Sequence, residues 1–452
     1  MHTHNYHTED MSIVKTVTHW IVNIAKRYKG EGIKSIHHKM DIYLLAEAHH
    51  QLNGKKSPGV DGVTKAEYGK NLSERLKNLL SEVCAQVYRA VPVKRAWIPK
   101  ENGEFRGLGI PAHEDKVLQK AVVMLVGPVF EIEFHNGSFG FRPGRNCHQA
   151  VRALDKAIYE GHYWIIDMDI RKYFDSIPHG PLLEMFRNRI KDGVLNRLIL
   201  GWLKAGVLDE GNWEESKEGT PQGGIISPLL ANLYLHEVLD KWIENVVKPR
   251  LLGSVKLVRF ADDAVLCFTR EDDARSVMEV LGKRLGKYGL ELHPEKTKLI
   301  DYRPKKDGGK VKSETFDFLG FTFYWGKSQK GKSVSKLKTM KKRFRAKLKE
   351  IGEWCRDNRH QPVAKQQKEL KVKLEGHIRY YGMTHNFRSV RGFIAEAERQ
   401  WWKWLNRRGS PKRVTWEKFR EKKKLRPWAV ARIVHSLGRE EAPVSEYTPY
   451  LI

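Results

Sequence analysis

Apolar and polar residues alternate with two different spacings along this chain. Between residues 12 and 28, apolar side chains recur every three or four positions, as at Ile13, Val17, Ile21 and Ile24, and this spacing predicts an amphipathic helix. By the same criterion we expect further helices over residues 41–52, 115–130, 228–247, 271–288 and 393–405. Ser227 is a good residue to cap the helix expected over 228–247, with Pro228 in its first turn.

Shorter runs of β-branched and aromatic residues predict strands that come in pairs. Residues 255–268, VKLVRFADDAVLCF, hold two such runs on either side of Ala261, Asp262 and Asp263, which is typical of a β-hairpin with an acidic tip. Residues 96–106 follow the order strand, Asn-Gly turn, strand, and residues 316–323 alternate like another hairpin. Helices and hairpins together predict an α+β fold.

The acidic pair at the tip of the hairpin suggests a metal site. Adjacent carboxylates between strands that are expected to be buried are unfavourable unless cations neutralise them. Carboxylate oxygens on a rigid turn suit Mg²⁺, which keeps positions open for substrate phosphates. Because an isolated acidic pair is more often a solvated turn, the metal interpretation needs a carboxylate from another strand.

A second strand supplies that carboxylate. Residues 163–170, YWIIDMDI, place Asp167 and Asp169 on one face, because strand side chains alternate with a period of two. Two metal ions held by carboxylates from separate strands are the usual apparatus of in-line phosphoryl transfer. The sequence therefore predicts a phosphoryl-transfer centre.

Charge points to a polyanionic partner. The 452 residues include 82 Lys and Arg against 54 Asp and Glu, a net charge of +28, which favours nucleic acid. Residues 326–432 hold 33 Lys and Arg against 9 Asp and Glu, with Trp and Tyr interleaved. No apolar run approaches the roughly 20 residues of a membrane-spanning helix, and no signal pattern opens the chain, so we expect a cytoplasmic protein without a membrane partner.

Several segments, in order along the chain, resemble reverse transcriptases encoded by group II introns. FADD at 260–263 stands where most members have YADD, so Phe260 replaces a tyrosine, and residues 219–232 match the block GTPQGGxxSPxLAN. Further matches are KSPGVDGVT at 56–64, IPKENGEFR at 98–106, SFGFRPGR at 138–145 and FLGF at 318–321. The resemblance implies a right-hand polymerase, with fingers and palm of antiparallel sheet and helices followed by an α-helical basic thumb.

The resemblance also implies roles for individual residues. Asp169, Asp262 and Asp263 would be catalytic and would hold two Mg²⁺ ions, with Asp167 in support. Phe174 would be a steric gate that excludes a ribose 2′-hydroxyl. The expected nucleotide-binding residues are Lys100, Arg106, Phe174, Gln222 and Lys296. The expected nucleic-acid-binding residues are Arg142, Arg145, Lys341, Lys342, Arg343, Arg345 and Arg379, of which the first two could equally brace the fold.

The expected domains are an N-terminal helical extension (1–55), fingers and palm (56–325), a thumb or maturase domain (326–437) and a tail (438–452). No CxxC pair follows the thumb, so the resemblance is to members that lack the Cys/His-containing endonuclease. Such a protein would use an RNA template, a DNA primer and dNTPs, and would bind intron RNA to promote splicing and retrohoming at a DNA target. The sequence does not indicate an oligomeric state.

Two other functions stay open at this stage. One is a domesticated reverse transcriptase that acts in DNA repair or phage defence, which a search for a ribozyme in the flanking DNA would distinguish. The other is a splicing maturase or RNA chaperone without polymerase activity. Three costly carboxylates argue against the second function, because an inactive site has no need of them.

Overall fold

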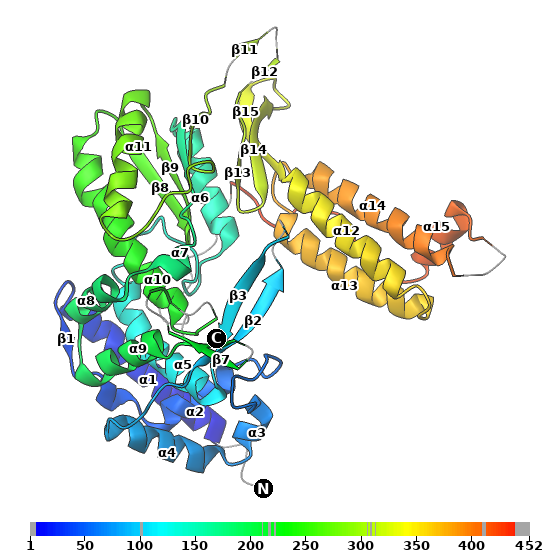
Figure 1. Ribbon diagram of the computed structural model, residues 1–452. Coiled ribbons are helices and arrows are strands. Elements are labelled where there is room, and N and C mark those ends of the chain that lie inside the picture. Colours follow the sequence, from blue (N-terminus) through cyan, green and yellow to red (C-terminus); the bar gives the residue numbers. More distant parts are fainter. Residues whose placement is uncertain are drawn as a thin grey trace. The chain divides into compact units, whose positions relative to one another are not determined.

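The computed structural model (Figure 1) describes residues 6–99, 103–209, 211–215, 218–220, 223–304, 306–307, 310–311, 313–408 and 413–438. They form two compact units. One comprises the described chain up to Ala150 and Ile166–Leu299, and the other comprises Val151–Ile165 and the described residues from Ile300 to Gly438. Among the described helices, none is long and apolar enough to cross a membrane.

Helices make up most of the first unit. They are α1 (Tyr6–Arg27), α2 (Ile42–Gln51), α3 (Lys65–Gly69), α4 (Leu72–Cys84), α5 (His113–Glu131), α7 (Tyr173–Ser176), α8 (His179–Arg189), α9 (Gly193–Lys204), α10 (Ser227–Leu235) and α11 (Glu271–Gly286), while α6 (Cys147–Tyr159) spans the division between units. Shorter 3-10 or π segments are η1 (His37–Lys39), η2 (His236–Asp240), η3 (Ile243–Val247) and η4 (Lys248–Arg250).

Two four-stranded sheets carry the expected hairpins. The first has the order β3-β2-β6-β7, with β2 (Val93–Pro99), β3 (Phe105–Ile110), β6 (Val207–Asp209) and β7 (Asn212–Glu214). The second has the order β10-β4-β9-β8, with β4 (Trp164–Met168), β8 (Val255–Phe260), β9 (Asp263–Phe268) and β10 (Lys298–Asp301). A parallel pair joins β1 (Ile33–Lys34) to β5 (Ile190–Lys191). The hairpins expected over 96–106 and 255–268 are therefore confirmed.

The helix after Ser227 differs from its prediction in two ways. Ile226, not Ser227, is the residue before the first helical position, and its side chain caps nothing. The helical path does continue to Val247, but it changes from α to π geometry at η2 and η3. π segments occur mostly as single turns at functional sites, and this one places Asp240 against the acidic hairpin, as described below.

The second unit combines a small sheet with a helical bundle. The sheet has β13 (Phe316–Phe318), β14 (Phe321–Lys327) and β15 (Ser333–Thr339) in that order, and β11 (Lys306–Asp307) pairs with β12 (Lys310–Val311). The helices are α12 (Lys341–Asp357), α13 (Val363–Tyr381), α14 (Phe387–Leu405) and α15 (Trp416–Lys424). They enclose an apolar core that includes Phe393 and Trp401, and the indole N–H of Trp401 donates to Gln366 Oε1 at 2.9 Å.

Candidate active site

The acidic hairpin turns over two residues. Register pairs Phe260 with Asp263, so Ala261 and Asp262 form the turn and Asp263 begins β9. Ala261 has φ +58°, the left-handed conformation that two-residue hairpin turns require. The strands behind the turn are buried, with Val265 and Leu266 fully enclosed. The turn therefore presents Asp262 and Asp263 at the end of a rigid, apolar hairpin.

A buried ion pair supports the turn from behind. Arg259 and Asp240 have side chains that are 0% exposed, and Arg259 donates to both Asp240 oxygens, at 2.9 and 2.7 Å. The remaining Arg259 nitrogen donates to the Ala261 carbonyl at 2.9 Å and to Asn232 Oδ1 at 3.0 Å. The hydrophobic pattern did not predict this network, although a single arginine in the apolar run VKLVRF was a signal for it.

Asp169 follows β4 and is held by the loop after α11. Its backbone carbonyl accepts from His293 N at 2.8 Å and from Thr297 Oγ1 at 3.3 Å. Lys296 Nζ lies 3.1 Å from Asp169 Oδ2. Lys296, which the sequence analysis assigned to the nucleotide, therefore neutralises the candidate metal ligand in this structure.

The charges of Asp169 and Arg106 both act on the Asp262 carboxyl group. Burial raises the pKa of Asp262, and the negative charge of Asp169 adds to this increase, whereas a backbone hydrogen bond and the charge of Arg106 oppose it. Among the described residues, no three His, Cys, Asp or Glu side chains are already arranged as a metal-binding group. The donors nevertheless fit Mg²⁺ chemically, because they are carboxylate oxygens from a turn and a strand end whose mutual repulsion a cation would relieve.

Phe174, the expected steric gate, lies on α7. Its half-buried ring makes edge contacts with Tyr173 and Phe141, at centroid distances of 5.5 and 6.2 Å. The Phe174 carbonyl accepts a hydrogen bond from Thr220 N at 2.8 Å. This bond fixes the start of the glycine-rich loop, residues 219–224 (GTPQGG). Farther along this loop, Gly223 has φ +115°, and a Cβ there would lie 2.4 Å from the Gly109 carbonyl oxygen. Only glycine fits at position 223. Gln222, which was expected to contact the nucleotide, lies outside the described residues.

The β2–β3 hairpin brings one expected nucleotide-binding residue to the site. Arg106 pairs with Ile98 across the hairpin and is exposed, and its charge lowers the pKa of Asp262. Lys100, the other expected phosphate ligand, lies outside the described residues.

Arg142 and Arg145 are engaged within the fold. The Arg142 side chain is 2% exposed and donates to both oxygens of Glu131 and to the carbonyls of His135 and Ser138. Arg145 donates to the Asn136 carbonyl at 2.7 Å and lies over the Phe139 ring. This placement favours the bracing role that the sequence left open for both residues.

Replacing Arg142 with methionine is expected to lower the free energy of unfolding by about 3 kcal/mol, since it leaves Glu131 and two carbonyls without their donor. Denaturant unfolding measures this loss. Arg275→Met, which breaks the exposed pair with Glu271, is the matched control and should cost less than about 0.5 kcal/mol. An Arg142 variant of normal stability with weakened RNA binding would instead support the template contact.

The other cations expected to bind nucleic acid belong to the second unit. Lys341, Lys342, Arg343 and Arg345 are exposed in the first turns of α12, and Arg379 is exposed on α13. The first turn of α12 contains no acidic residue. Cations are unfavourable at the positive end of a helix, so this end favours a bound anion such as phosphate.

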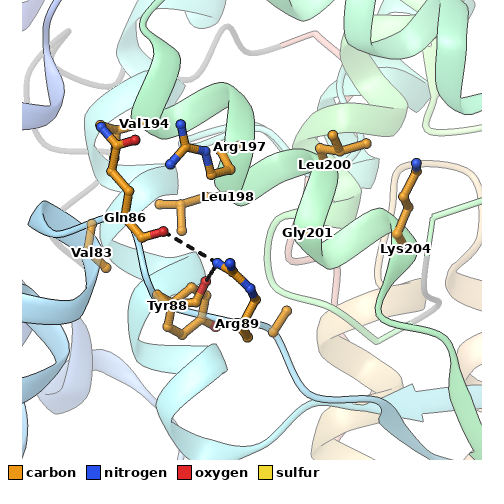
Figure 2. A pocket seen from close by; sticks show the side chains of 11 residues that line it. Val83, Gln86, Tyr88, Arg89, Val194, Arg197, Leu198, Leu200, Gly201 and Lys204 are labelled. Atoms are coloured by element: carbon orange, nitrogen blue, oxygen red, sulfur yellow. Dashed lines mark hydrogen bonds between the residues drawn. The ribbon is translucent and has the colours of Figure 1, made fainter.

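A cavity of about 360 Å³ lies elsewhere in the first unit, between α9 and the loop after α4 (Figure 2). Val83, Leu198 and Tyr88 give it apolar walls, and Arg89 donates into the surrounding loop, to the Tyr88 carbonyl at 3.0 Å. None of the 11 residues that line it is acidic. It therefore lacks the carboxylates of a metal-dependent centre and is distinct from the acidic hairpin.

Comparison with known proteins agrees with the geometry. Residues 98–323 match the family described as reverse transcriptase (RNA-dependent DNA polymerase). The chain is 35% identical to Protein YkfC of Escherichia coli over 277 residues, which cover 54% of this chain and 73% of YkfC. It is 38% identical over 204 residues to the group II intron-encoded protein LtrA of Lactococcus lactis, covering 45% of this chain and 33% of LtrA. A putative COX1/OXI3 intron 2 protein of Saccharomyces cerevisiae is 34% identical over 209 residues, 45% of this chain and 24% of that protein.

Proposed function

Because the chain belongs to the reverse transcriptases, or RNA-directed DNA polymerases, of the group II intron-encoded type, we propose that it extends a DNA primer on RNA by two-metal nucleotidyl transfer. We further propose that it binds intron RNA and promotes splicing and retrohoming. The observation that supports the first proposal is that Asp169 and Arg106 lie close enough to Asp262 for their charges to act on it. The charge of Arg106 lowers the pKa of Asp262, and the charge of Asp169 raises it.

In this mechanism Asp169, Asp262 and Asp263 would hold two Mg²⁺ ions, which would supply Lewis-acid activation of the primer 3′-hydroxyl and charge stabilisation of the pyrophosphate leaving group. Arg106 binds the triphosphate, because a guanidinium can donate two parallel hydrogen bonds to phosphate oxygens. Lys100 adds a positive charge next to the same phosphates. Gln222 contacts the nucleotide or its base pair. Phe174 occupies the space that a ribose 2′-hydroxyl would need.

We propose two partners for the Lys296 ammonium group, the Asp169 carboxylate and the phosphates of the nucleotide. In the structure its ammonium neutralises Asp169. The Lys296 side chain is 60% exposed, so its ammonium can also reach the phosphates of the incoming nucleotide, which is the role expected from the sequence.

The RNA-binding part of the proposal rests on α12. The N-terminal end of α12 has two sources of positive potential, the helix dipole and the exposed side chains of Lys341, Lys342 and Arg345. Intron RNA would be bound through its phosphates and shape, as helical RNA requires.

Changing Lys341, Lys342 and Arg345 together to glutamine is expected to make the salt dependence of RNA affinity shallower. Each lost phosphate contact reduces the slope of log affinity against log salt by about 0.7–0.9, so about 2 units are expected in total. Lys77, Lys283 and Lys287, exposed lysines of the first unit, form a control triple that removes the same charge. Equal effects of the two triples would show that net charge alone drives binding.

A separation-of-function experiment tests the two activities together. The full chain and its Asp262→Asn/Asp263→Asn variant are added to a group II intron RNA at a Mg²⁺ concentration too low for unaided splicing. The proposal predicts that both proteins promote splicing and that only the natural chain extends a primer. Primer extension without splicing of any intron found in the flanking DNA would favour a domesticated enzyme of repair or defence.

A further inference from the structure

Phe141 has a strained backbone next to the candidate active site. Its φ is +55°, in the left-handed region that residues other than glycine rarely adopt. Seven residues other than glycine have a positive φ in the described part of the chain, and three of them are at this site: Phe141, Lys172 and Ala261. Lys172 lies two residues before Phe174, and Ala261 directly precedes Asp262. Strain of this kind persists only where surrounding contacts impose it, and it concentrates at functional sites.

The contacts that impose this conformation come from the acidic hairpin and α10. The Gly140 carbonyl accepts from Asn232 Nδ2 at 2.7 Å, and Phe139 N donates to the Arg259 carbonyl at 2.8 Å. A Cβ on Gly140 would lie 2.3 Å from Ala261 N. With Arg142 buried on the other side, the backbone of Phe141 is fixed to the element that carries Asp262 and Asp263.

This fixed backbone presents the ring to Phe174. Phe141 is 57% exposed, and its ring meets Phe174 edge to face, with centroids 6.2 Å apart and planes at 83°. Phe174 also contacts Tyr173, which is buried and donates to the Ala231 carbonyl at 2.5 Å. Phe174 therefore contacts one buried aromatic ring and one exposed aromatic ring.

We propose that Phe141 is a positioning residue for sugar selection, whose ring holds Phe174 in the orientation that excludes a ribose 2′-hydroxyl from the pocket for the incoming deoxynucleoside triphosphate. This inference rests on the proposed function. A large exposed ring on a strained backbone contributes little to the core, and its one described ring contact is the residue that would contact the sugar. Loss of the ring leaves Phe174 free to rotate away, so ribonucleotides are admitted more readily.

The first test is Phe141→Gly in the full chain. Glycine adopts a positive φ without strain, so this variant loses the ring and should melt at the same temperature as the natural protein or higher. In RNA-templated primer extension, its preference for dNTP over rNTP, as the ratio of kcat/KM values, should fall about two- to tenfold, the range that an edge-to-face aromatic pair supports. The change should appear mainly in KM, and Phe141→Tyr should retain the preference.

A double variant tests whether Phe141 acts through Phe174. In a Phe174→Ala background the gate is absent, so adding Phe141→Gly should change the preference no further. Gln86→Gly relieves the same strain at φ +62° beside the cavity of Figure 2 and should leave the preference unchanged. An unaltered preference in Phe141→Gly, or equal additional loss in both backgrounds, would overturn the inference. If the natural chain does not extend a primer, it is instead the proposed polymerase function that fails.

Discussion

Replacing Asp262 with asparagine is expected to lower the rate of RNA-templated primer extension by at least about a thousandfold. The two-metal centre loses a ligand that supplies both a negative charge and a correctly placed oxygen. The fold should survive the change. Burial raises the pKa of Asp262, which means that the folded state disfavours its charge. A neutral amide of the same shape removes this cost, so the melting temperature should stay the same or rise.

Single-turnover extension from a preformed RNA–DNA primer complex measures this effect. Asp272→Asn is the matched control, because it removes an exposed acid from the first turn of α11 and should leave the rate within about twofold. An Asp262→Asn protein that is folded, binds the primer complex and extends it at the natural rate would contradict the metal assignment.

The largest effect on stability is expected from Asp240→Asn. This variant leaves the fully buried guanidinium of Arg259 without its counter-charge, and breaking a buried pair on one side costs about 3–5 kcal/mol. Because Arg259 also holds the Ala261 carbonyl, the acidic turn should loosen as well, with partial loss of primer extension. Replacing both partners with apolar residues of similar volume should recover much of the stability.

The same pair predicts how stability depends on pH. Burial alone would raise the pKa of Asp240, but the charge of Arg259, the His236 ring 3.6 Å away and the hydrogen bonds from Arg259 outweigh it and lower the pKa to about 2. A lowered carboxyl pKa stabilises the folded state above the unfolded pKa of about 4, and this contribution is lost as the pH falls towards 2. Denaturant unfolding at pH 7 and pH 3 should show a smaller decrease for Asp240→Asn than for the natural protein. An equal decrease in the two proteins would contradict this account.

The hydrophobic spacing predicted the local elements that carry the site. The 255–268 hairpin, the 96–106 hairpin and the strand containing Asp167 all form where expected, because each has a strong period of its own. The family, likewise, followed from motifs such as FADD and GTPQGG. The catalytic, nucleotide-binding and RNA-binding roles remain predictions, as do the domain boundaries.

What the sequence did not predict depends on contacts between distant segments. Asp240, the partner of Arg259, is the last residue of the π segment η2, which no periodicity reveals. The burial of Arg142 against Glu131 could not be distinguished from a template contact, because an arginine after a glycine-rich turn suits both. The capping role expected of Ser227 was wrong, because the helix begins at this residue itself.

The most direct test of the central claim is primer extension by the natural chain on an RNA template, with dNTPs and a titration of Mg²⁺, beside the Asp262→Asn/Asp263→Asn variant. The account predicts template-directed DNA synthesis that requires Mg²⁺ and that the variant lacks, although both proteins bind the primer complex. Tight binding of the complex without synthesis by the folded natural protein would contradict the account and favour a splicing maturase.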